Sequence, residues 1–337
     1  MKFVQKGAPQ YKANLHSHST RSDGKLSPEE MIRLYKEHGY SILAITDHEA
    51  TYAYNEYTTP EFLMITGYEA YIRPASDCSF DPFGEEIHLN LIAKEPDNLT
   101  FIGRDLNFCK YMPHELALSR PNVDIGPHRY NREFIQKFID TANANGYLVS
   151  YNHPCWSMQP QAEVLAYNGC YSLELFNGGC TALNGAEYNV ALYDALLRSG
   201  KYWYCHGADD NHNLDPLDSR LSDSFGAWTM ILAEELTYPA VINALENGRF
   251  YASTGPQILA LEIQDGKVRL ECSEAVRITM HCSMKRCQTV AAPFGQTVTQ
   301  AEFEIPTWTP HVYFSVHAQD GTEAYTHAFR NTENEND

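Results

Sequence analysis

The sequence contains no apolar run long enough to cross a membrane. A transmembrane helix needs about 20 consecutive, mostly apolar residues, and no window of this sequence reaches that length. The first residues, MKFVQKGAPQYKAN, also lack the apolar core of a secretion signal. We therefore expect a chain with no membrane partner, and the cytoplasm is its default compartment.

Basic residues are scarce. The chain has 25 Lys and Arg against 43 Asp and Glu, which gives a formal net charge of −18. A chain with this charge repels polyanions at long range, so extended nucleic acid is not expected as a partner. A small anionic substrate remains compatible, because local cations can hold one phosphate group inside an acidic protein.

Cysteines are present, but their positions in the sequence show no motif of paired cysteines. There are nine of them, an odd number, and no Cys-x-x-Cys motif occurs. This pattern predicts reduced, mostly buried thiols rather than a disulfide framework. Cys282 and Cys287 are candidates for a redox pair, although isolated thiols are more often small core residues.

The 337 residues are enough for one large domain and a small one. Short β-rich apolar runs, which we interpret as buried strands, end at residue types that do chemistry: ANLHSH, SILAITDH, FLMITGYE, EEIHLNLIA, YLVSYNHP, YSLELFNGG and YWYCHGADDNH. Helical patterns with capping residues and closing glycines lie between them, at residues 27–39, 131–146 and 187–200. This alternation predicts an α/β fold with a parallel sheet, whose reactive groups gather at the C-terminal strand ends.

The pattern changes after about residue 255. Alternating runs such as ILALEIQ, KVRLECS and VYFSVHAQ follow, with Asp-Gly turns at Asp265 and Asp320. These are hairpin and sandwich signals. We therefore expect one domain over residues 1–255, a β-sandwich over 256–330 and a disordered tail over 331–337.

Histidines and carboxylates recur at or near the ends of the expected strands. His16 and His18 alternate along one strand end, so that both imidazoles point to the same side, as two ligands of one metal must. A His-x-His pair alone is weak evidence, because two ordinary core or surface histidines give the same pattern. The complete set of nine potential ligands is His16, His18, Asp23, His48, Glu69, His88, His153, Asp210 and His212.

In this order the motifs LHSHSTRSDG, AITDH, NHP and ADDNH resemble those of the polymerase and histidinol phosphatase (PHP) superfamily. The resemblance spans about residues 12–255 and implies a distorted (β/α)7 barrel with a binuclear or trinuclear metal site. The segment NALENGRFYASTGPQI and the β-rich region after it are similar to a branch whose barrel carries a small C-terminal β-sandwich. For that sandwich we expect a role in covering the barrel and in homodimer contacts.

The resemblance also implies a distribution of ligands over two or three divalent cations, which would be zinc, manganese or iron. One metal would be held by His16, His18, Glu69 and Asp210; a second would share Glu69 and add His88 and His153; a third would use Asp23, His48 and His212. Many relatives have histidine at the position of Asp23. In the fourth motif Asp210 is preferred over Asp209, because an Asp-x-His pair on a strand end turns both side chains the same way.

The function implied is hydrolysis of small phosphomonoesters or phosphodiesters through a metal-activated water. Candidate catalytic helpers are Arg21, Arg73, His128 and Arg129; for His128 and Arg129 a solvated loop position is the alternative. Two other functions remain open. The same site would also suit a carboxylic ester, amide or carbamate, and a metal-stabilised binding protein without catalysis would need the same ligands.

Overall fold

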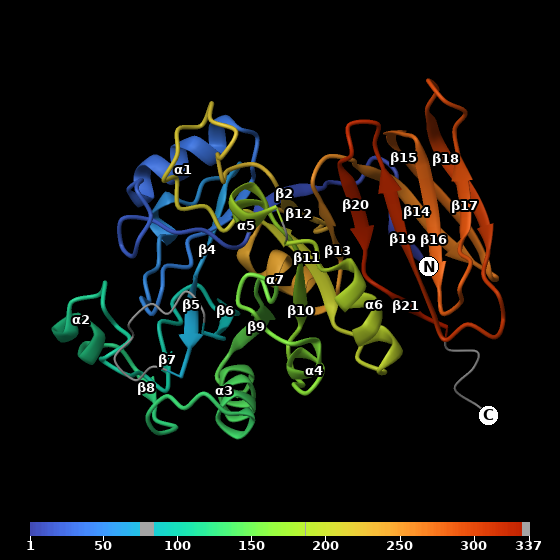
Figure 1. Cartoon of the computed structure of the whole chain (residues 1–337). Coiled ribbons are helices and arrows are strands. Elements are labelled where there is room, and N and C mark those ends of the chain that lie inside the picture. The colour runs from blue at the N-terminus through green and yellow to red at the C-terminus, as the bar shows by residue number, and fades with distance from the viewer. Residues whose placement is uncertain (75–83, 186, 332–337) are drawn as a thin grey trace.

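The computed structural model describes residues 1–74, 84–185 and 187–331. The chain forms an α/β part, seen at the left of Figure 1, followed by a second, mostly β domain at the right. The tail predicted to be disordered lies outside the described residues from position 332 onward. Among the described residues, no helix is long and apolar enough to span a membrane.

The helices form where the capping signals place them. Helix α1 (Pro28–Glu37) begins with the predicted capping box, in which Ser27 and Glu30 each bond the other's backbone N–H. Asn131 caps α3 (Arg132–Ala144), and α6 covers Val190–Arg198. The remaining helices are α2 (His114–Ser119), α4 (Gln161–Val164), α5 (Gly178–Asn184), α7 (Tyr238–Glu246) and the 3-10 turn η1 (Asn55–Tyr57).

A five-stranded sheet lies at the centre of the α/β part. In spatial order it contains β11 (Tyr204–Ala208), β10 (Ser172–Asn177), β9 (Tyr147–Tyr151), β6 (Ile87–Ala93) and β5 (Gly67–Ile72). Strands β9, β10 and β11 are parallel, as expected. The expectation of a wholly parallel sheet was wrong for β6, which runs antiparallel to both β5 and β9. The described residues between β5 and β6, 73–74 and 84–86, form no helix.

A ten-stranded sheet joins the two parts of the molecule. Nine of its strands follow one another in the order β17 (Gln288–Ala291), β16 (Arg277–Cys282), β19 (His311–His317), β20 (Glu323–Thr326), β13 (Phe250–Ser253), β12 (Trp228–Ile231), β2 (Tyr11–Asn14), β3 (Ile42–Ala44) and β4 (Leu63–Ile65). The tenth, β21 (Phe329–Arg330), pairs with β19 outside this order. Strands β2, β3 and β4 are parallel. Because β13 pairs with β20, this sheet continues from the α/β part into the C-terminal strands. The boundary near residue 255 stays a prediction.

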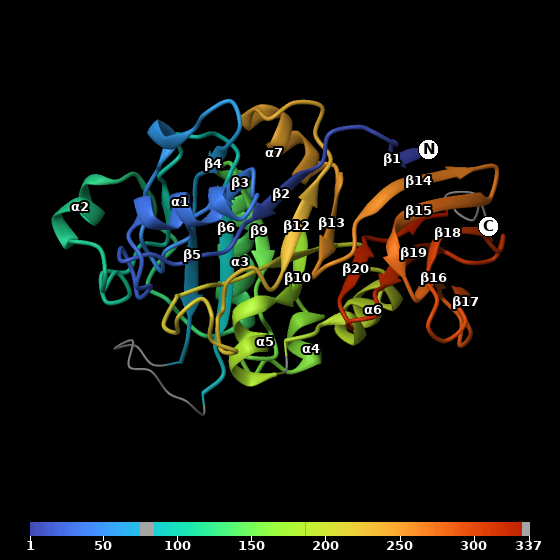
Figure 2. The same ribbon diagram turned by 90° about the horizontal axis from the view of Figure 1, so that it is seen from above.

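The C-terminal strands form two packed layers, as Figure 2 shows from above. The second layer is a four-stranded sheet of β1 (Lys2–Val4), β14 (Ile258–Gln264), β15 (Lys267–Ala275) and β18 (Val298–Glu304). Asp265 and Gly266 form the predicted two-residue turn between β14 and β15, both with positive φ. Buried apolar residues of both sheets, among them Leu261, Leu270 and Phe314, fill the space between the layers.

The two edges of the five-stranded sheet lie close to the ten-stranded sheet. An isolated bridge joins Ser17, just after β2, to Asn211, just after β11. A second bridge joins His48, after β3, to Glu69 in β5. Elsewhere, β7 (Phe101–Ile102) pairs with β8 (Asn122–Val123). The first bridge joins residues that lie between predicted ligands, and the second joins two predicted ligands.

Candidate metal centre

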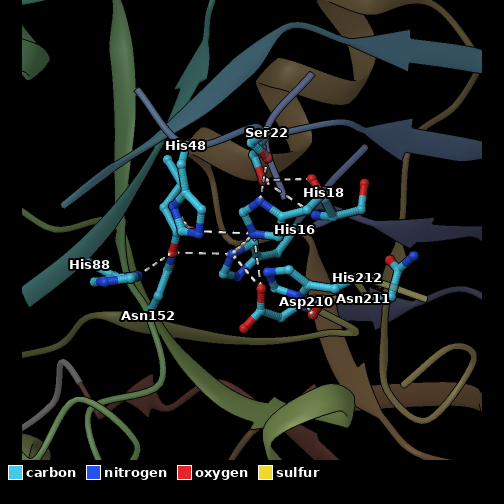
Figure 3. A network of polar contacts seen from close by, with 12 residues as sticks. His16, His18, Ser22, His48, His88, Asn152, Asp210, Asn211 and His212 are labelled. Atoms are coloured by element: carbon cyan, nitrogen blue, oxygen red, sulfur yellow. Dashed lines mark hydrogen bonds and ion pairs between the residues drawn. The ribbon is translucent and has the colours of Figure 1, made fainter. Parts of the chain in front are cut away.

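The nine predicted ligands converge from distant parts of the chain, as Figure 3 shows for most of them. His16 and His18 follow β2, His48 follows β3, and Glu69 lies within β5. His153 follows β9, and Asp210 and His212 follow β11. His88 lies near the start of β6 rather than at its end. Because β6 runs antiparallel to its neighbours, its start lies at the same edge as their ends.

The most buried group consists of His16, Glu69, His153 and Asp210. His16 Nε2 lies 3.1 Å from Glu69 Oε1 and 3.0 Å from Asp210 Oδ1. His153 Nε2 lies 3.3 Å from the same Glu69 oxygen. Four ligand atoms from four separate segments thus surround one point.

Two further groups adjoin the first. His18, Asp23, His48 and His212 form one of them, in which Asp23 lies 3.7 Å from His48 Nε2 and 3.5 Å from His212 Nε2. His48, Glu69 and His88 form the other, with both imidazoles within 3.2 Å of a Glu69 oxygen. Glu69 therefore belongs to two of the three groups, as the resemblance implied for a shared carboxylate.

The distances place two histidines in other ligand groups than the expected scheme did. His18 groups with Asp23 and His212, although its Nε2 also lies 3.0 Å from Asp210 Oδ1. His153 groups with His16 and Asp210 rather than with His88. Both histidines stand between neighbouring groups, so spacing along the sequence could not assign them.

The residues present fit divalent cations. Atoms that ligate one zinc ion at about 2.1 Å lie roughly 3 to 3.5 Å apart, and the closest contacts of the cluster have this spacing. His16 Nε2 and His18 Nε2 face each other at 3.2 Å. Among the described residues, buried ligand atoms without a hydrogen bond include Asp23 Oδ1, Glu69 Oε2, His88 Nε2 and Asp210 Oδ1. Such atoms are costly to bury unless a cation binds them.

The cluster is strongly polarised without added cations. Burial alone would lower the pKa of His18, but Asp210 and Glu69 outweigh it and raise that pKa to about 10. The same opposition raises the pKa of His88 to about 9, through Glu69 and Glu86. Burial and the charge of His18 lower the pKa of His212 to about 4. The carboxylates thus create a negative field that favours positive charge at their centre.

A buried carboxylate that the sequence did not single out supports His16. Glu174 Oε1 lies 2.9 Å from His16 Nδ1, on the side of the ring away from the cluster. Its other oxygen accepts from the backbone N–H of His153 and from Asn177 Nδ2, both at 2.9 Å. A histidine that donates to a carboxylate is held in one tautomer and one orientation toward a metal. The available signal was a glutamate within the apolar strand run YSLELFN.

The two aspartates that neighbour predicted ligands do not belong to the cluster. Asp47 accepts from the backbone and hydroxyl of Ser19 and from Ser22 Oγ, at 2.7 to 2.8 Å. Asp209 accepts from Tyr35 Oη and from two backbone N–H groups. Desolvation raises the pKa of Asp209 to about 6. Both side chains therefore orient loops instead of facing the cluster.

A cavity of about 410 Å³ lies over the cluster. Among the described residues, its lining includes the cationic side chains of Arg73 and Lys110. Arg73 Nε is held at 2.9 Å by Glu86, whose other oxygen lies 3.4 Å from His88 Nε2. The apolar part of the lining consists of Tyr71, Tyr111, Trp156, Leu183 and Leu214. A small anion in this cavity would meet both the predicted metal ligands and two cationic side chains.

The other proposed helpers lie elsewhere. Of the described residues, Arg21, His128 and Arg129 are absent from the cavity lining. His128 packs against Phe108 and its Nε2 bonds to the carbonyl of Gly103 at 2.9 Å, while Arg21 stacks on Tyr52. Motif position alone did not reveal which way these side chains point. Conversely, Lys110 belongs to a loop with no motif, and Trp156 lies two residues after the NHP motif but is not part of it, so the sequence did not single out either residue.

Residues 14–146 match the family model described as the PHP domain. Of the curated proteins, none matches the chain.

Three solved structures resemble the chain at low identity. A two-domain protein from Bacteroides vulgatus, containing a predicted PHP-like metal-dependent phosphoesterase, is 15% identical, with 97% of this chain and 98% of that chain covered and a TM-score of 0.46. A predicted metal-dependent phosphoesterase from Bifidobacterium adolescentis is 15% identical, with 64% and 94% covered and a TM-score of 0.34. An amidohydrolase from Chromobacterium violaceum with bound sulfate and no metal is 16% identical, with 59% and 87% covered and a TM-score of 0.34.

With TM-scores below 0.5, these structures say nothing about the substrate of this chain. The family match is more informative, because it covers the segment that supplies His16, His18, His48, Glu69 and His88. His153, Asp210 and His212 lie beyond the matched residues, yet they complete the same cluster. The chain is therefore similar to the PHP domain over residues 14–146.

Proposed function

We propose that this protein is a metal-dependent phosphoesterase that hydrolyses small phosphomonoesters or phosphodiesters with two or three divalent cations. The observation that carries the proposal is the convergence of nine histidine and carboxylate side chains under one cavity that also contains Arg73 and Lys110. Divalent cations bound there would supply an activated water and would offset the charge of a phosphoryl group.

The side chains of the cluster would act as ligands in three overlapping groups. Glu69 would join two of them, because its oxygens contact His16, His48 and His88 at 3.0 to 3.2 Å. Glu174 would keep Nδ1 of His16 occupied as a donor, so that Nε2 is available to a cation. Zinc suits the imidazoles, while manganese or iron fits the carboxylates equally well.

Arg73 and Lys110 would act on the substrate rather than on the cations. Glu86 holds Arg73 beside His88, so the guanidinium is positioned at the edge of the cluster. A fixed positive charge near a phosphoryl oxygen stabilises the charge that develops during attack. Arg73 is therefore the helper that we retain from the sequence, with Lys110 added.

We also infer that the α/β part is a distorted (β/α)7 barrel. The strands β5, β6, β9, β10 and β11 form one arc, and β2 and β3 form another. The bridges Ser17–Asn211 and His48–Glu69 connect the ends of these arcs. The ring is joined there by single bridges rather than by continuous ladders, which would leave its interior open at the cluster.

One specific observation favours a second candidate function, the hydrolysis of a carboxylic ester, amide or carbamate. The cavity lining contains more apolar and aromatic side chains than cationic ones. A neutral substrate would suit such a lining. It would not need Arg73 or Lys110.

The test combines metal analysis with a substrate panel. Protein purified without chelator is analysed for metal content and assayed with a phosphomonoester, a phosphodiester and an aryl carboxylic ester. We expect bound metal and turnover of a phosphate ester. Turnover of the carboxylic ester alone would favour the second candidate, and full metal loading without turnover of any ester would favour a binding protein.

Glu69→Gln tests whether the cluster is the site of turnover. We expect this variant to lose metal and activity together, because it removes a charge shared by two groups. Glu49→Gln is the matched control. Glu49 is also buried, but it lies outside the three groups and accepts one backbone N–H, from Tyr71 at 3.1 Å, which a glutamine oxygen can also accept. Wild-type metal content in Glu69→Gln would contradict the assignment.

A further inference from the structure

The cavity has an apolar wall that hydrolysis of a phosphate group does not require. Trp156, Leu183 and Leu214 come from three separate segments and line the same space as the cluster. Leu183 is 53% exposed and Leu214 is 57% exposed. Large apolar side chains this exposed gain from a partner that removes them from water.

The indole of Trp156 is held in place before any ligand arrives. The carboxylate of Glu187 accepts the backbone N–H of Trp156 at 2.7 Å and that of Cys155 at 3.1 Å. Glu187 is itself buried and bonded to Asn189 Nδ2 at 2.7 Å. The ring stands edge-on to His88, with centroids 5.3 Å apart, and to His153 at 5.1 Å. A ring fixed in this way costs little additional ordering when it binds a ligand.

The segment that carries Leu183 is also fixed. Helix α5 approaches the turn after β11 so closely that a Cβ added at Gly179 would lie 2.9 Å from the carbonyl oxygens of both Asp209 and Asp210. Asn177 caps the helix, because its Oδ1 accepts the backbone N–H of Cys180 at 2.8 Å. The position of Leu183 relative to Asp210 is therefore set by backbone contacts.

The chemical character of the cavity is thus divided. The predicted ligands, Arg73 and Lys110 suit a phosphate group, whereas the wall offers few hydrogen-bonding groups to a sugar or polyol. A polyol would lose its water without gaining partners there, which costs free energy. A flat aromatic group would instead pack on the indole and the two leucines.

We propose that the substrate is a phosphomonoester whose alcohol carries an aromatic ring, and that Trp156, Leu183 and Leu214 bind that ring. This inference rests on the proposed phosphoesterase function. In this proposal the apolar wall makes the protein select phosphate esters whose alcohol carries an aromatic ring.

The test compares two esters with leaving groups of similar reactivity, 2-phenylethyl phosphate and ethyl phosphate. Both release a primary alcohol, so the ratio of their kcat/KM values measures recognition of the ring. We expect a ratio of about tenfold or more for the wild-type protein, the range in which an apolar pocket discriminates. Trp156→Ala is expected to reduce the ratio to below about threefold, because the largest apolar surface of the wall is removed.

Two further variants separate the role of the ring from general damage. Trp156→Phe retains an aromatic ring and should keep most of the preference. Trp308→Ala removes a tryptophan that is 55% exposed in the C-terminal domain, and it should leave both kcat/KM values unchanged. Metal content is measured for each variant, so that a variant that no longer assembles the cluster is recognised.

The outcomes test the ring-binding wall and the phosphoesterase proposal separately. Equal kcat/KM values for the two esters, or a preference that survives in Trp156→Ala, would overturn the ring-binding wall and leave the phosphoesterase proposal standing. Hydrolysis of neither ester by metal-loaded protein would overturn the inference that the substrate is a phosphomonoester, and a lack of turnover of the phosphodiester as well would overturn the phosphoesterase proposal itself.

Discussion

Glu174 shows how one residue outside the predicted ligand set can control the site. Its carboxylate contacts His16 Nδ1 at 2.9 Å and is fully buried. Desolvation opposes the ionisation of Glu174. The charges of neighbouring histidines, His16 above all, nevertheless keep the pKa of Glu174 below its usual range. An ionised carboxylate behind a metal-binding imidazole raises the basicity of that ring and fixes its orientation.

We predict that Glu174→Gln weakens metal binding without preventing folding. Glutamine fills the same space but loses the charge that pairs with His16. The expected loss in metal affinity is about 10-fold to 100-fold, as for other supporting carboxylates. Competition with a chelator measures it as a change in apparent Kd, and activity should return at saturating metal.

The control is Glu323→Gln, which removes a comparable pair in the C-terminal domain, where Glu323 Oε1 lies 2.6 Å from His317 Nδ1. Its metal affinity should equal that of the wild type. An unchanged Kd for Glu174→Gln would mean that the contact with His16 plays no part in metal binding.

At the residue scale, the sequence located the potential ligands but not the residues that hold those ligands in place. Histidines and carboxylates at strand ends form a pattern that can be recognised along the chain, and the structure brings all nine of those residues together. Glu174 and Asn152 act through contacts to distant residues, such as the 2.8 Å bond from Asn152 to Glu69. Such contacts exist only after folding, so they cannot be predicted from the local sequence.

At the element scale, strand existence was easier to predict than strand direction. The run EEIHLNLIA was correctly expected to be a buried strand, and β6 occupies Ile87–Ala93. Its antiparallel direction was not expected. A continuous apolar run has the same composition in either direction, so it does not show whether the strand runs parallel to its neighbours.

The close contact between α5 and the turn after β11 predicts the effect of adding one methyl group at Gly179. Gly179→Ala should destabilise the protein by about 1 to 3 kcal/mol, because the new Cβ would collide with two backbone carbonyls that cannot move independently. The turn that it would displace carries Asp210 and His212, so metal content should also fall. Denaturant unfolding of the metal-free protein and elemental analysis measure the two effects.

Asn184→Ala is the control for that substitution, because Asn184 is exposed at the other end of the same helix. It should leave both stability and metal content close to the wild-type values. Wild-type stability in Gly179→Ala would show that α5 can shift away from the turn without cost.

At the scale of the whole molecule, the two parts share a sheet and a core. Ser253 of β13 pairs with Ala324 of β20, and β1 at the N-terminus pairs with β14. Tyr313 and Tyr325 of the C-terminal strands belong to the same buried cluster as Phe176 and Tyr193 of the α/β part. The sequence predicted the change to alternating strands, but pairing across it depends on residues far apart in the chain.

We therefore predict that the metal-free protein unfolds in one cooperative transition. Separate domains with few shared contacts would unfold independently, whereas a shared sheet couples them. Differential scanning calorimetry should give one peak, with a calorimetric enthalpy close to the van't Hoff enthalpy. Tyr193→Phe removes the hydroxyl that accepts the backbone N–H of Ala328 at 2.9 Å, and it should lower the temperature of that single peak. Two resolved peaks would contradict the prediction.

The junction between the two parts also gives the protein a sensitivity to acid. His327 is buried against Phe3, Tyr204 and Phe329, with ring centroids 4.7 to 5.2 Å apart. Burial lowers the pKa of His327 to about 4. In the unfolded chain its pKa is about 6.5. The unfolded state therefore binds a proton first as the pH falls, and the contribution of neutral His327 to stability, complete above pH 6.5, declines from there toward pH 4.

We predict that His327→Phe makes the stability less dependent on pH in this range. One pKa unit corresponds to about 1.4 kcal/mol, so at pH 5 the wild type should have lost on the order of 1 to 2 kcal/mol more than the variant, relative to pH 7. Urea unfolding of the metal-free proteins at both pH values measures this difference. The histidines of the metal cluster are present in both proteins, so their own titration cancels in the comparison. An equal loss in both proteins would mean that the ring of His327 is protonated without disturbing the junction.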